Sequence, residues 1–292
     1  MRYMNSVLSL LVTALLSSAA LADEPQVPAK ISNPFYAMDT AFQRPELSDD
    51  QQLDLVRELG FAGIAWHEQS PDAARAVAQK CEKRGLKMLA IYYAAQVTPA
   101  GDITWSPSLP KAMKALKGHE TIIWLHIGGR GPAFDDQLSA QPVVQKLRDL
   151  ADLAAASGLK IAIYPHLGEW TARFGDTTKL ADAVDRPNFG VSFNLCHCLA
   201  AGDEKKIPQL LTAAKKRLFI VQISGADSGV TGGQWKQLIQ TLDKGTFDMG
   251  AVLRKLKELG FDGPIGFQGY AIAGDARSIL TPTMAAWRKL SQ

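Results

Sequence analysis

The sequence predicts a (β/α)8 barrel, an α/β fold in which eight parallel strands alternate with helices and close on themselves. Eight short apolar runs of β character recur along the chain, and segments with helical spacing separate them. Glycine repeatedly ends a helical segment just before the next apolar run. Four of the five histidines stand where an apolar run gives way to a loop. In such a barrel the loops after the strands share one face, and that face carries the chemistry.

The predicted strands are short apolar runs that end in polar or glycine-containing sequence. They cover 35–38, 63–66, 87–93, 121–127, 160–164, 190–194, 218–223 and 265–268. The clearest predicted helices carry apolar residues three and four positions apart, as at Leu53, Val56 and Leu59. They cover 49–59, 71–84, 143–157, 207–216, 249–259 and 276–290. A doubly wound open sheet is the alternative fold, but no GxGxxG motif follows the first strand.

The first 22 residues have the pattern of a secretory signal peptide. Arg2 supplies positive charge, residues 7–16 form an apolar stretch, and Ala20-Leu21-Ala22 forms a cleavage site. The apolar stretch is short for a bilayer span, and a retained signal anchor is the alternative interpretation. We therefore expect a signal peptide at 1–22, a leader at 23–32 and a single barrel domain at 33–292. We also expect a periplasmic or secreted protein that leaves the membrane after cleavage.

Charge and cysteine content argue against several classes of function. Removing Arg2 from the 32 basic residues leaves 31 against 29 acidic residues, and no basic stripe suggests a nucleic-acid partner. Three cysteines do not make a disulfide framework. Cys196 and Cys198 flank His197, but structural zinc needs a second pair of ligands and none is near. We expect these two cysteines to be small buried residues.

Two predicted connections are longer than a barrel requires. They cover 94–110, which contains Trp105, and 224–246, which contains Trp235. Both follow predicted strands and so belong to the functional face, where long loops form lids and substrate walls. Trp105 and Trp235 are therefore candidate stacking platforms for a sugar. Surface decoration is the alternative for the loops, and loop anchoring is the alternative for the two tryptophans.

Polar and aromatic side chains gather at the predicted strand ends. They include His67, Glu68, Tyr92, His126, Arg130, Tyr164, His166, Glu169, Asn194, His197, Gln222, Gln268 and Tyr270. Hydrogen-bonding groups beside aromatic rings suit a polyhydroxylated ligand such as a sugar, and histidine can act as acid, base or metal ligand. Structural alternatives are a strand cap for His67, a rim salt bridge for Glu68 and a tight turn at His126. Glu169 and Arg130 are interpreted as loop and surface charges.

Several segments resemble a known family. They are Ile163-Tyr164-Pro165-His166, Asn194-Leu195-Cys196-His197, the segment 222–227 and the segment 263–270. Through them, residues from about 33 to 290 resemble the xylose-isomerase-like TIM barrel superfamily of sugar isomerases and epimerases. The chain is similar to the exported branch described as sugar phosphate isomerase/epimerase. A phosphate is nevertheless not expected, because Gly128-Gly129-Arg130-Gly131 is only a weak candidate for a phosphate cradle.

The resemblance also implies a divalent metal, which the family holds with Glu, Asp, His and Glu from four late strands. These positions fall on Tyr164, Asn194, Gln222 and Gln268, whereas the companion histidines match His166 and His197. Neutral side chains do not offset the charge of a divalent ion as three carboxylates do. The family's two glutamates also serve as acid and base around a metal-bound enediolate. We therefore expect the standard metal site to be absent and no cofactor to be needed.

Three functions remain open, and the favoured one is an isomerase, epimerase or lyase on a small carbohydrate. Its expected catalytic residues are His166 and His197, which exchange protons, together with His67 and Glu68. Its expected substrate-binding residues are Tyr164, Asn194, Gln222, Gln268, His126, Trp105 and Trp235. A variant of this hypothesis places a relocated metal on His67, Glu68, His126 or His166. A non-catalytic carbohydrate-binding protein is the second function, and a DNA-repair nuclease of the same superfamily conflicts with the signal peptide and the missing ligands.

Overall fold

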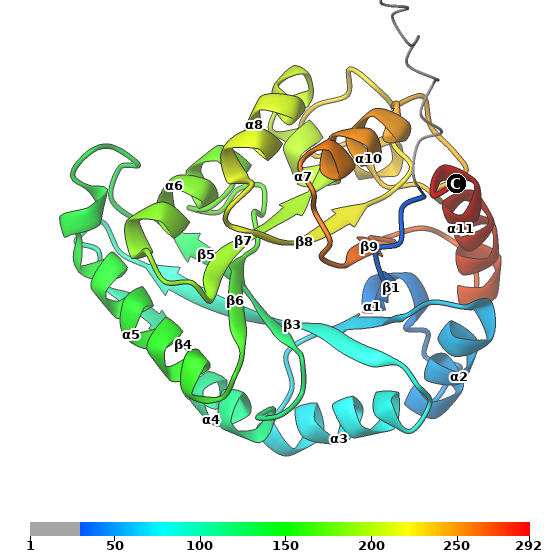
Figure 1. Cartoon of the computed structure of the whole chain (residues 1–292), viewed down its shortest axis with the longest axis horizontal. Helices are drawn as coiled ribbons and strands as arrows, with labels where there is room; N and C mark the ends of the chain where they lie inside the picture. Colours follow the sequence, from blue (N-terminus) through cyan, green and yellow to red (C-terminus); the bar gives the residue numbers. More distant parts are fainter. Residues whose placement is uncertain (1–29) are drawn as a thin grey trace, which may run out of the picture. The chain divides into compact units, whose positions relative to one another are not determined.

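Residues 30–292 are described by the computed structural model, and they form a closed barrel of eight parallel strands (Figure 1). The order around the barrel is β2-β1-β9-β8-β7-β6-β5-β3, and pairing of β3 with β2 closes it. The strands are β1 (Phe35–Met38), β2 (Gly63–Trp66), β3 (Lys87–Val97), β5 (Ile122–Gly129), β6 (Lys160–Ile163), β7 (Phe189–Asn194), β8 (Leu218–Ile223) and β9 (Ile265–Phe267). The predicted fold class is confirmed. The predicted signal peptide and the leader up to residue 29 lie outside the described residues.

A ring of helices surrounds the strands (Figure 1). The α-helices are α1 (Asp39–Phe42), α2 (Asp49–Leu59), α3 (Pro71–Glu82), α4 (Ser108–Ala115), α5 (Pro142–Ala156), α6 (Phe174–Val184), α7 (Leu195–Ala200), α8 (Ile207–Ala214), α9 (Trp235–Leu238), α10 (Met249–Glu258) and α11 (Ala276–Leu290). Two short 3-10 helices are η1 (Leu138–Ala140) and η2 (Glu204–Lys206). In this described part of the chain, no helix has the length and apolar character needed to cross a bilayer.

The predicted long connection 94–110 is largely regular structure. β3 continues through Val97, and its last residues pair antiparallel with β4 (Ile103–Trp105). The same stretch of β3 pairs on its other edge with β5, as far as Val97 opposite Gly129. The strand therefore runs beyond its apolar core segment because it has a partner on both edges. Trp105 lies on β4 and not on a free loop.

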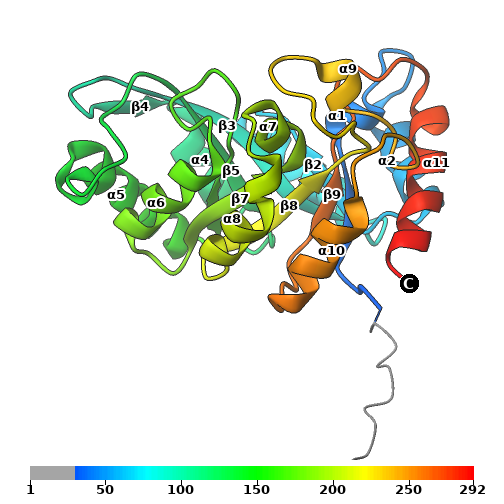
Figure 2. The same cartoon turned by 90° about the horizontal axis from the view of Figure 1, so that it is seen from above.

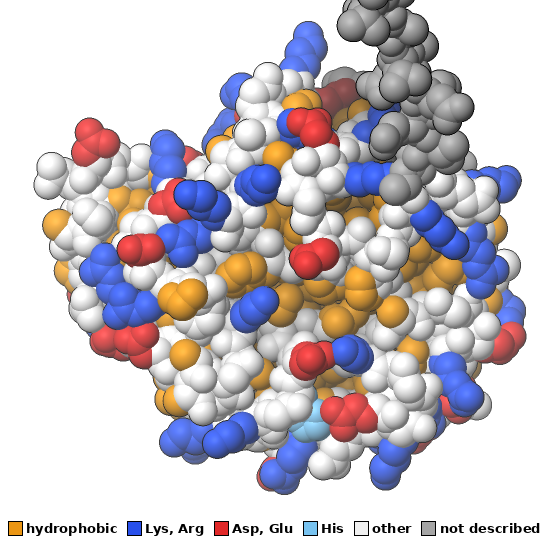
Figure 3. Space-filling view, viewed as in Figure 1, with side chains coloured by type: hydrophobic (Ala, Val, Ile, Leu, Met, Phe, Trp, Pro, Cys, Tyr) orange, Lys and Arg blue, Asp and Glu red, His pale blue; other side chains and the backbone are white. Residues whose placement is uncertain are grey.

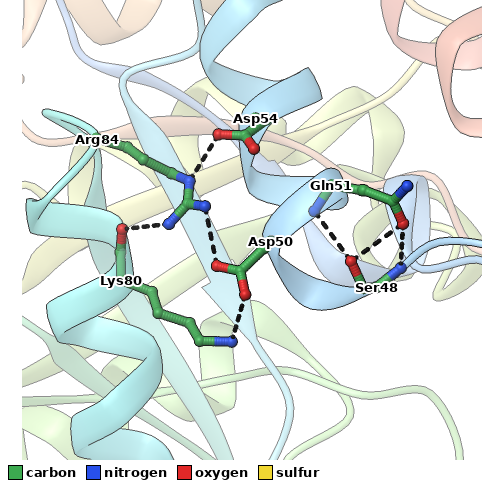
Figure 4. Close-up of polar contacts among 6 residues, drawn as sticks. All are labelled: Ser48, Asp50, Gln51, Asp54, Lys80 and Arg84. Carbon is green, nitrogen blue, oxygen red and sulfur yellow. Dashed lines mark hydrogen bonds and ion pairs between the residues drawn. The ribbon is translucent and has the colours of Figure 1, made fainter.

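Local signals define both ends of α2. The Ser48 hydroxyl accepts a hydrogen bond from the Gln51 backbone amide, and the Gln51 side chain accepts one from Ser48 (Figure 4). At the other end Gly60 adopts a left-handed conformation with φ of 92°, and its amide bonds to the carbonyls of Arg57 and Val56. The glycine that the sequence places after this helix is thus its C-terminal cap.

Three arginines tie neighbouring helices together, and each lies in the turn between a helix and the next strand. Arg84, which follows α3, binds Asp50 and Asp54 of α2 at 2.9 and 2.7 Å (Figure 4). The other two pairings join Arg186 to Asp152, and Arg217 to Asp182 and Asp185. A turn that enters a strand lies at the strand's N-terminal end. This network therefore belongs to the end of the barrel opposite the catalytic face of such folds.

Aromatic side chains fill the inside of the barrel. Tyr36, Trp124 and Tyr164 are almost fully buried, and Trp124 lies 6.1 Å from the Tyr36 ring and 5.3 Å from the Tyr164 ring. Below them, at the N-terminal ends of the strands, Leu89 and Phe219 help to line a hollow of about 700 Å³. This end faces the viewer in Figure 3, where apolar side chains run across the middle. The packed aromatic layer separates this hollow from the other end of the barrel.

Candidate active site

A pocket opens at the carboxyl ends of the strands, where barrels of this kind place their chemistry. Its volume is about 340 Å³, which is in the range of small-molecule sites. Helix α9 lies over this end of the barrel, which is uppermost in Figure 2. The lining consists of Met38, Asp39, Thr40, His67, Tyr92, Tyr164, His166, His197, Trp235, Ile239, Gln268 and Tyr270.

Two predicted histidines, His166 and His197, lie side by side in the pocket, with ring centroids 4.5 Å apart. His197 lies in α7, whose N-terminus Asn194 caps by accepting a hydrogen bond from the His197 amide. The Nδ1 atom of His197 accepts a hydrogen bond from the Leu167 amide at 3.3 Å. Burial, and to a smaller extent the neighbouring His166, lower the pKa of His197 to about 3. His197 is therefore a neutral imidazole that carries its proton on Nε2.

His166, unlike His197, has no hydrogen bond to its Nδ1 atom in the described part of the chain. Its Nδ1 is buried and has no hydrogen-bond partner among residues 30–292. The Oε1 atom of Glu169 lies 3.7 Å from this nitrogen, which is longer than a hydrogen bond. The side chain is 39% exposed although Nδ1 is buried, so the exposure falls on the rest of the ring. The two residues belong to one tight turn, in which the Glu169 amide donates to the His166 carbonyl.

A third predicted histidine, His126, binds Glu169 behind the pocket wall. Its Nδ1 lies 2.8 Å from both carboxylate oxygens. Tyr92 stacks on the His126 ring with centroids 4.6 Å apart, and Tyr92 itself lines the pocket. Burial and the charge of Glu169 raise the pKa of the Tyr92 phenol, so this group stays protonated. Glu169, interpreted from the sequence as a loop charge, is thus in contact with the site.

Asp39 is a pocket residue that was not among those predicted from the sequence. Asp39 directly follows β1, is 4% exposed, and places Oδ2 2.8 Å from Nδ1 of His67. The Gln69 side-chain amide contacts the other ring nitrogen of His67, so both nitrogens are engaged. The rule that selected His67 at the end of the second strand also selects Asp39 at the end of the first. Applying the same criterion to the end of the first predicted strand would have found it.

The predicted site residues are only partly brought together. Those that line the pocket are His67, Tyr164, His166, His197, Trp235 and Gln268. Glu68 is exposed and accepts a hydrogen bond from the Ser108 hydroxyl, outside the pocket. Trp105 packs against the core from β4, because the segment expected to be a free loop is a strand. Asn194 and Gln222 are fully buried and do not reach the pocket surface.

The family model described as xylose isomerase-like TIM barrel matches residues 53–278. The chain belongs to this family. A search of curated proteins finds no match to the sequence. The family membership, which the sequence motifs predict, is thus confirmed by a model that covers most of the barrel.

Solved structures with the same fold include sugar epimerases. A D-allulose 3-epimerase from Methylomonas sp. has a TM-score of 0.66 and 16% identity, over 90% of this chain and 99% of that one. A 3-keto-D-glucoside 4-epimerase from E. coli has a TM-score of 0.64 and 15% identity, over 88% and 99%. A fusion of a xylose isomerase-like TIM barrel with 4-hydroxyphenylpyruvate dioxygenase has a TM-score of 0.65 and 17% identity; this chain covers 42% of it and aligns over 88% of its own length. At these identities the similarity establishes the fold.

Two of the four positions at which the sequence resemblance implies metal ligands are bonded to each other here. The Asn194 side-chain amide donates to the Tyr164 hydroxyl at 2.7 Å. The Asn194 oxygen accepts from the His197 amide and from the Cys196 thiol. Cys196 is buried, as expected from the sequence. Burial raises the pKa of Tyr164 well above its ordinary value, so its oxygen remains a neutral phenol.

The side chains at the other two positions, Gln222 and Gln268, also form hydrogen bonds within the protein. The Gln222 amide donates to the Tyr36 hydroxyl, and its oxygen accepts from Ser192, both at 2.8 Å. The Gln268 oxygen accepts from the Thr40 hydroxyl at 2.6 Å. No group of three or more His, Cys, Asp or Glu within residues 30–292 is arranged to hold a metal ion. The four neutral side chains therefore do not fit the divalent-metal site that the resemblance implies.

Proposed function

We propose that this protein is a carbohydrate-active isomerase, epimerase or lyase that moves a proton on its substrate by means of histidines. Membership of the xylose isomerase-like family, together with structural neighbours that are sugar epimerases, supports the general class. The observation that carries the proposal is the pair formed by His166 and His197. These adjacent imidazoles offer opposite hydrogen-bonding roles to one ligand.

His197 is the hydrogen-bond donor of the pair. Its Nδ1 is engaged with the Leu167 amide and its low pKa keeps the ring neutral, so Nε2–H is the group left for a ligand. A fixed N–H beside a carbonyl oxygen stabilises the negative charge that develops when the neighbouring carbon loses a proton. The sequence predicted that the two histidines exchange protons, whereas in the function proposed here they have different tasks.

His166 is the base of the pair, because its Nδ1 is buried while the rest of the ring, which carries Nε2, is exposed in the pocket. It takes the proton from the carbon beside the carbonyl, and the electron pair of that bond forms an enediolate. Delivery of a proton to the opposite face of the same carbon gives an epimer, and delivery to the neighbouring carbon gives an isomer. Loss of a β-hydroxyl group with a proton, as water, gives a dehydrated product. General acid–base catalysis of this kind contributes roughly 10²–10⁴-fold.

The lining favours an uncharged sugar over a sugar phosphate. Among the described residues, none of those that line the pocket is Lys or Arg, and a phosphate withdrawn from water requires cationic or charge-assisted partners. The carboxylate of Asp39 opposes an anion further. Trp235 and Tyr270 offer aromatic faces to the C–H groups of a sugar ring, and Gln268 offers an amide to its hydroxyls.

A carbohydrate-binding protein without catalysis is the second candidate function. The specific observation in its favour is that phenol and amide groups stand at Tyr164, Asn194, Gln222 and Gln268 while the pocket is retained. Of these four, Tyr164 and Gln268 line the pocket and can bind hydroxyls, and none of the four replaces the acid and base of the family. The two candidates therefore differ in whether a bound sugar exchanges its carbon-bound hydrogen.

We also propose that the protein acts outside the cytoplasm, in the periplasm or after secretion. This part rests on the signal-peptide pattern of residues 1–22. Sequencing the N-terminus of protein recovered from the periplasm or the culture medium tests it. A mature chain that begins at Asp23 supports the proposal, and a chain that retains residues 1–22 contradicts it.

Hydrogen exchange tests the enzymatic function. Purified protein is incubated in D2O with a panel of unphosphorylated ketoses and aldoses, and proton NMR follows the C–H signal beside the carbonyl. Exchange with one sugar that falls at least about 100-fold in His166→Asn, and persists in His119→Asn, supports catalysis. His119 is the matched control because it binds Glu82 at the opposite end of the barrel. Saturable calorimetric binding without exchange supports the binding protein, and neither binding nor exchange contradicts both candidates.

A further inference from the structure

We propose that Glu169 is a positioning residue that determines which ring nitrogen of His166 carries the proton. The chemical use of this arrangement rests on the proposed function, whereas the arrangement itself is a matter of geometry. Glu169 is a carboxylate between two imidazoles. It lies 2.8 Å from Nδ1 of His126 and 3.7 Å from Nδ1 of His166.

A carboxylate can only accept hydrogen bonds, and this decides the tautomer of His166. Nδ1 of His166 is buried, with Glu169 beside it and no hydrogen-bond partner within residues 30–292. With the proton on Nδ1, the N–H dipole points towards a negatively charged oxygen, which is favourable. With the proton on Nε2, the Nδ1 lone pair faces that oxygen, and the two electron-rich atoms repel each other in a site of low polarity. The proton therefore resides on Nδ1. Nε2 keeps the lone pair that a base requires.

His126 determines where the carboxylate stands. Both Glu169 oxygens are bonded to His126 Nδ1, and the ring of Tyr92 stacked on His126 restricts how that ring turns. The side chains of His126 and Glu169 are 14% and 19% exposed, so water competes little for these bonds. One histidine thus orients the carboxylate, and the carboxylate orients the other histidine.

Proton uptake by His166 strengthens this arrangement. When the carbon-bound proton of the substrate moves to Nε2, the His166 ring becomes a cation whose Nδ1 atom lies 3.7 Å from Oε1 of Glu169. A charge-assisted hydrogen bond has a length of about 2.8 Å, so a movement of about 1 Å completes it. The bond forms only after proton transfer begins. Glu169 therefore favours the step and not the binding of substrate.

Nitrogen-15 NMR of the histidine rings tests the proposal on the free, full-length protein. In the wild type, His166 should be protonated on Nδ1 and His197 on Nε2. In Glu169→Gln the amide oxygen still accepts from His126 while the amide nitrogen donates to His166 Nδ1, which moves the His166 proton to Nε2. Glu120 pairs with Lys87 and lines the hollow at the opposite end of the barrel. The control Glu120→Gln makes the same substitution there and should leave both tautomers unchanged.

Two results would overturn the proposal: an Nε2-protonated His166 in the wild type, or the wild-type His166 tautomer in Glu169→Gln. The wild-type spectrum decides by itself if the variant does not fold. With a sugar that exchanges, Glu169→Gln should lower kcat by roughly 10²–10⁴-fold and leave KM unchanged. If the tautomers are as stated and no sugar exchanges, the proposed function fails and the positioning role of Glu169 stands.

Discussion

Replacing His197 with asparagine should remove a pH dependence of folding stability. The pKa of His197 is about 3 in the folded protein and 6.5 in an unfolded reference, because burial disfavours the charged ring. As the pH falls below 6.5, the unfolded state therefore binds a proton that the folded state does not. The free energy of unfolding is unaffected by this group above pH 6.5 and declines as the pH falls towards 3, by about 1.4 kcal/mol per pH unit.

The magnitude follows from these two pKa values. Between pH 7 and pH 5, protonation of His197 in the unfolded state lowers the free energy of unfolding by about 2 kcal/mol, and by pH 4 the loss is about 3 kcal/mol. In His197→Asn the amide oxygen occupies a position close to that of Nδ1 and can accept the Leu167 amide, but the side chain does not titrate. Subtracting the variant from the wild type removes the contributions of other titrating groups.

Urea unfolding at pH 7, 6, 5 and 4, followed by tryptophan fluorescence, measures this difference. The wild type should lose about 2 kcal/mol more than the variant between pH 7 and pH 5. Parallel pH profiles for the two proteins would refute the reasoning. His197 would then not be held neutral, and its assignment as a permanent hydrogen-bond donor in the pocket would be wrong.

Three further substitutions test other parts of the structure. Asn194→Ala should lower the free energy of unfolding by about 3 kcal/mol, because it removes the α7 cap and the hydrogen-bond donor to Tyr164. A loss below about 1 kcal/mol in urea unfolding at pH 7 would contradict this expectation. Gly266→Ala should lower the melting temperature by several degrees in calorimetry, because the Cβ of the alanine would overlap the Tyr36 ring. An unchanged melting temperature would show that the Tyr36 ring can move aside without loss of stability. Asp39→Asn should slow hydrogen exchange on a sugar substrate by about 10-fold or more, because His67 loses its carboxylate partner; an unchanged rate would place this pair outside the chemistry.

The fold was largely predictable because its signals are local. The bounds of β1, β2 and β8 coincide with the predicted apolar runs, and α2 and α11 coincide with the predicted helical segments. The end of β3 was not predictable, because its extension to Val97 depends on pairing with both β4 and β5. Such pairing joins segments that are distant in sequence and leaves little trace in either of them.

The candidate site was predictable as a region and less so as a set of contacts. Strand-end reasoning selected His166 and His197, which do lie together in the pocket. It did not foresee that Gln222, also at a strand end, is bonded to Tyr36 inside the barrel. How deep a side chain lies along the barrel axis depends on how neighbouring strands are offset from one another, and the pattern of apolar residues does not predict that offset. The contact between Glu169 and His126 likewise joins the loop after β6 to strand β5, which are distant in the sequence.

The arginine pairs between neighbouring helices have a consequence for how this protein tolerates change. Arg186 and Arg217 hold adjoining helices from turns at the end of the barrel that faces away from the pocket. Cohesion of the ring and recognition of a ligand thus depend on separate groups of residues. Side chains at the mouth of the barrel can therefore change, and the ligand with them, while the scaffold beneath remains intact.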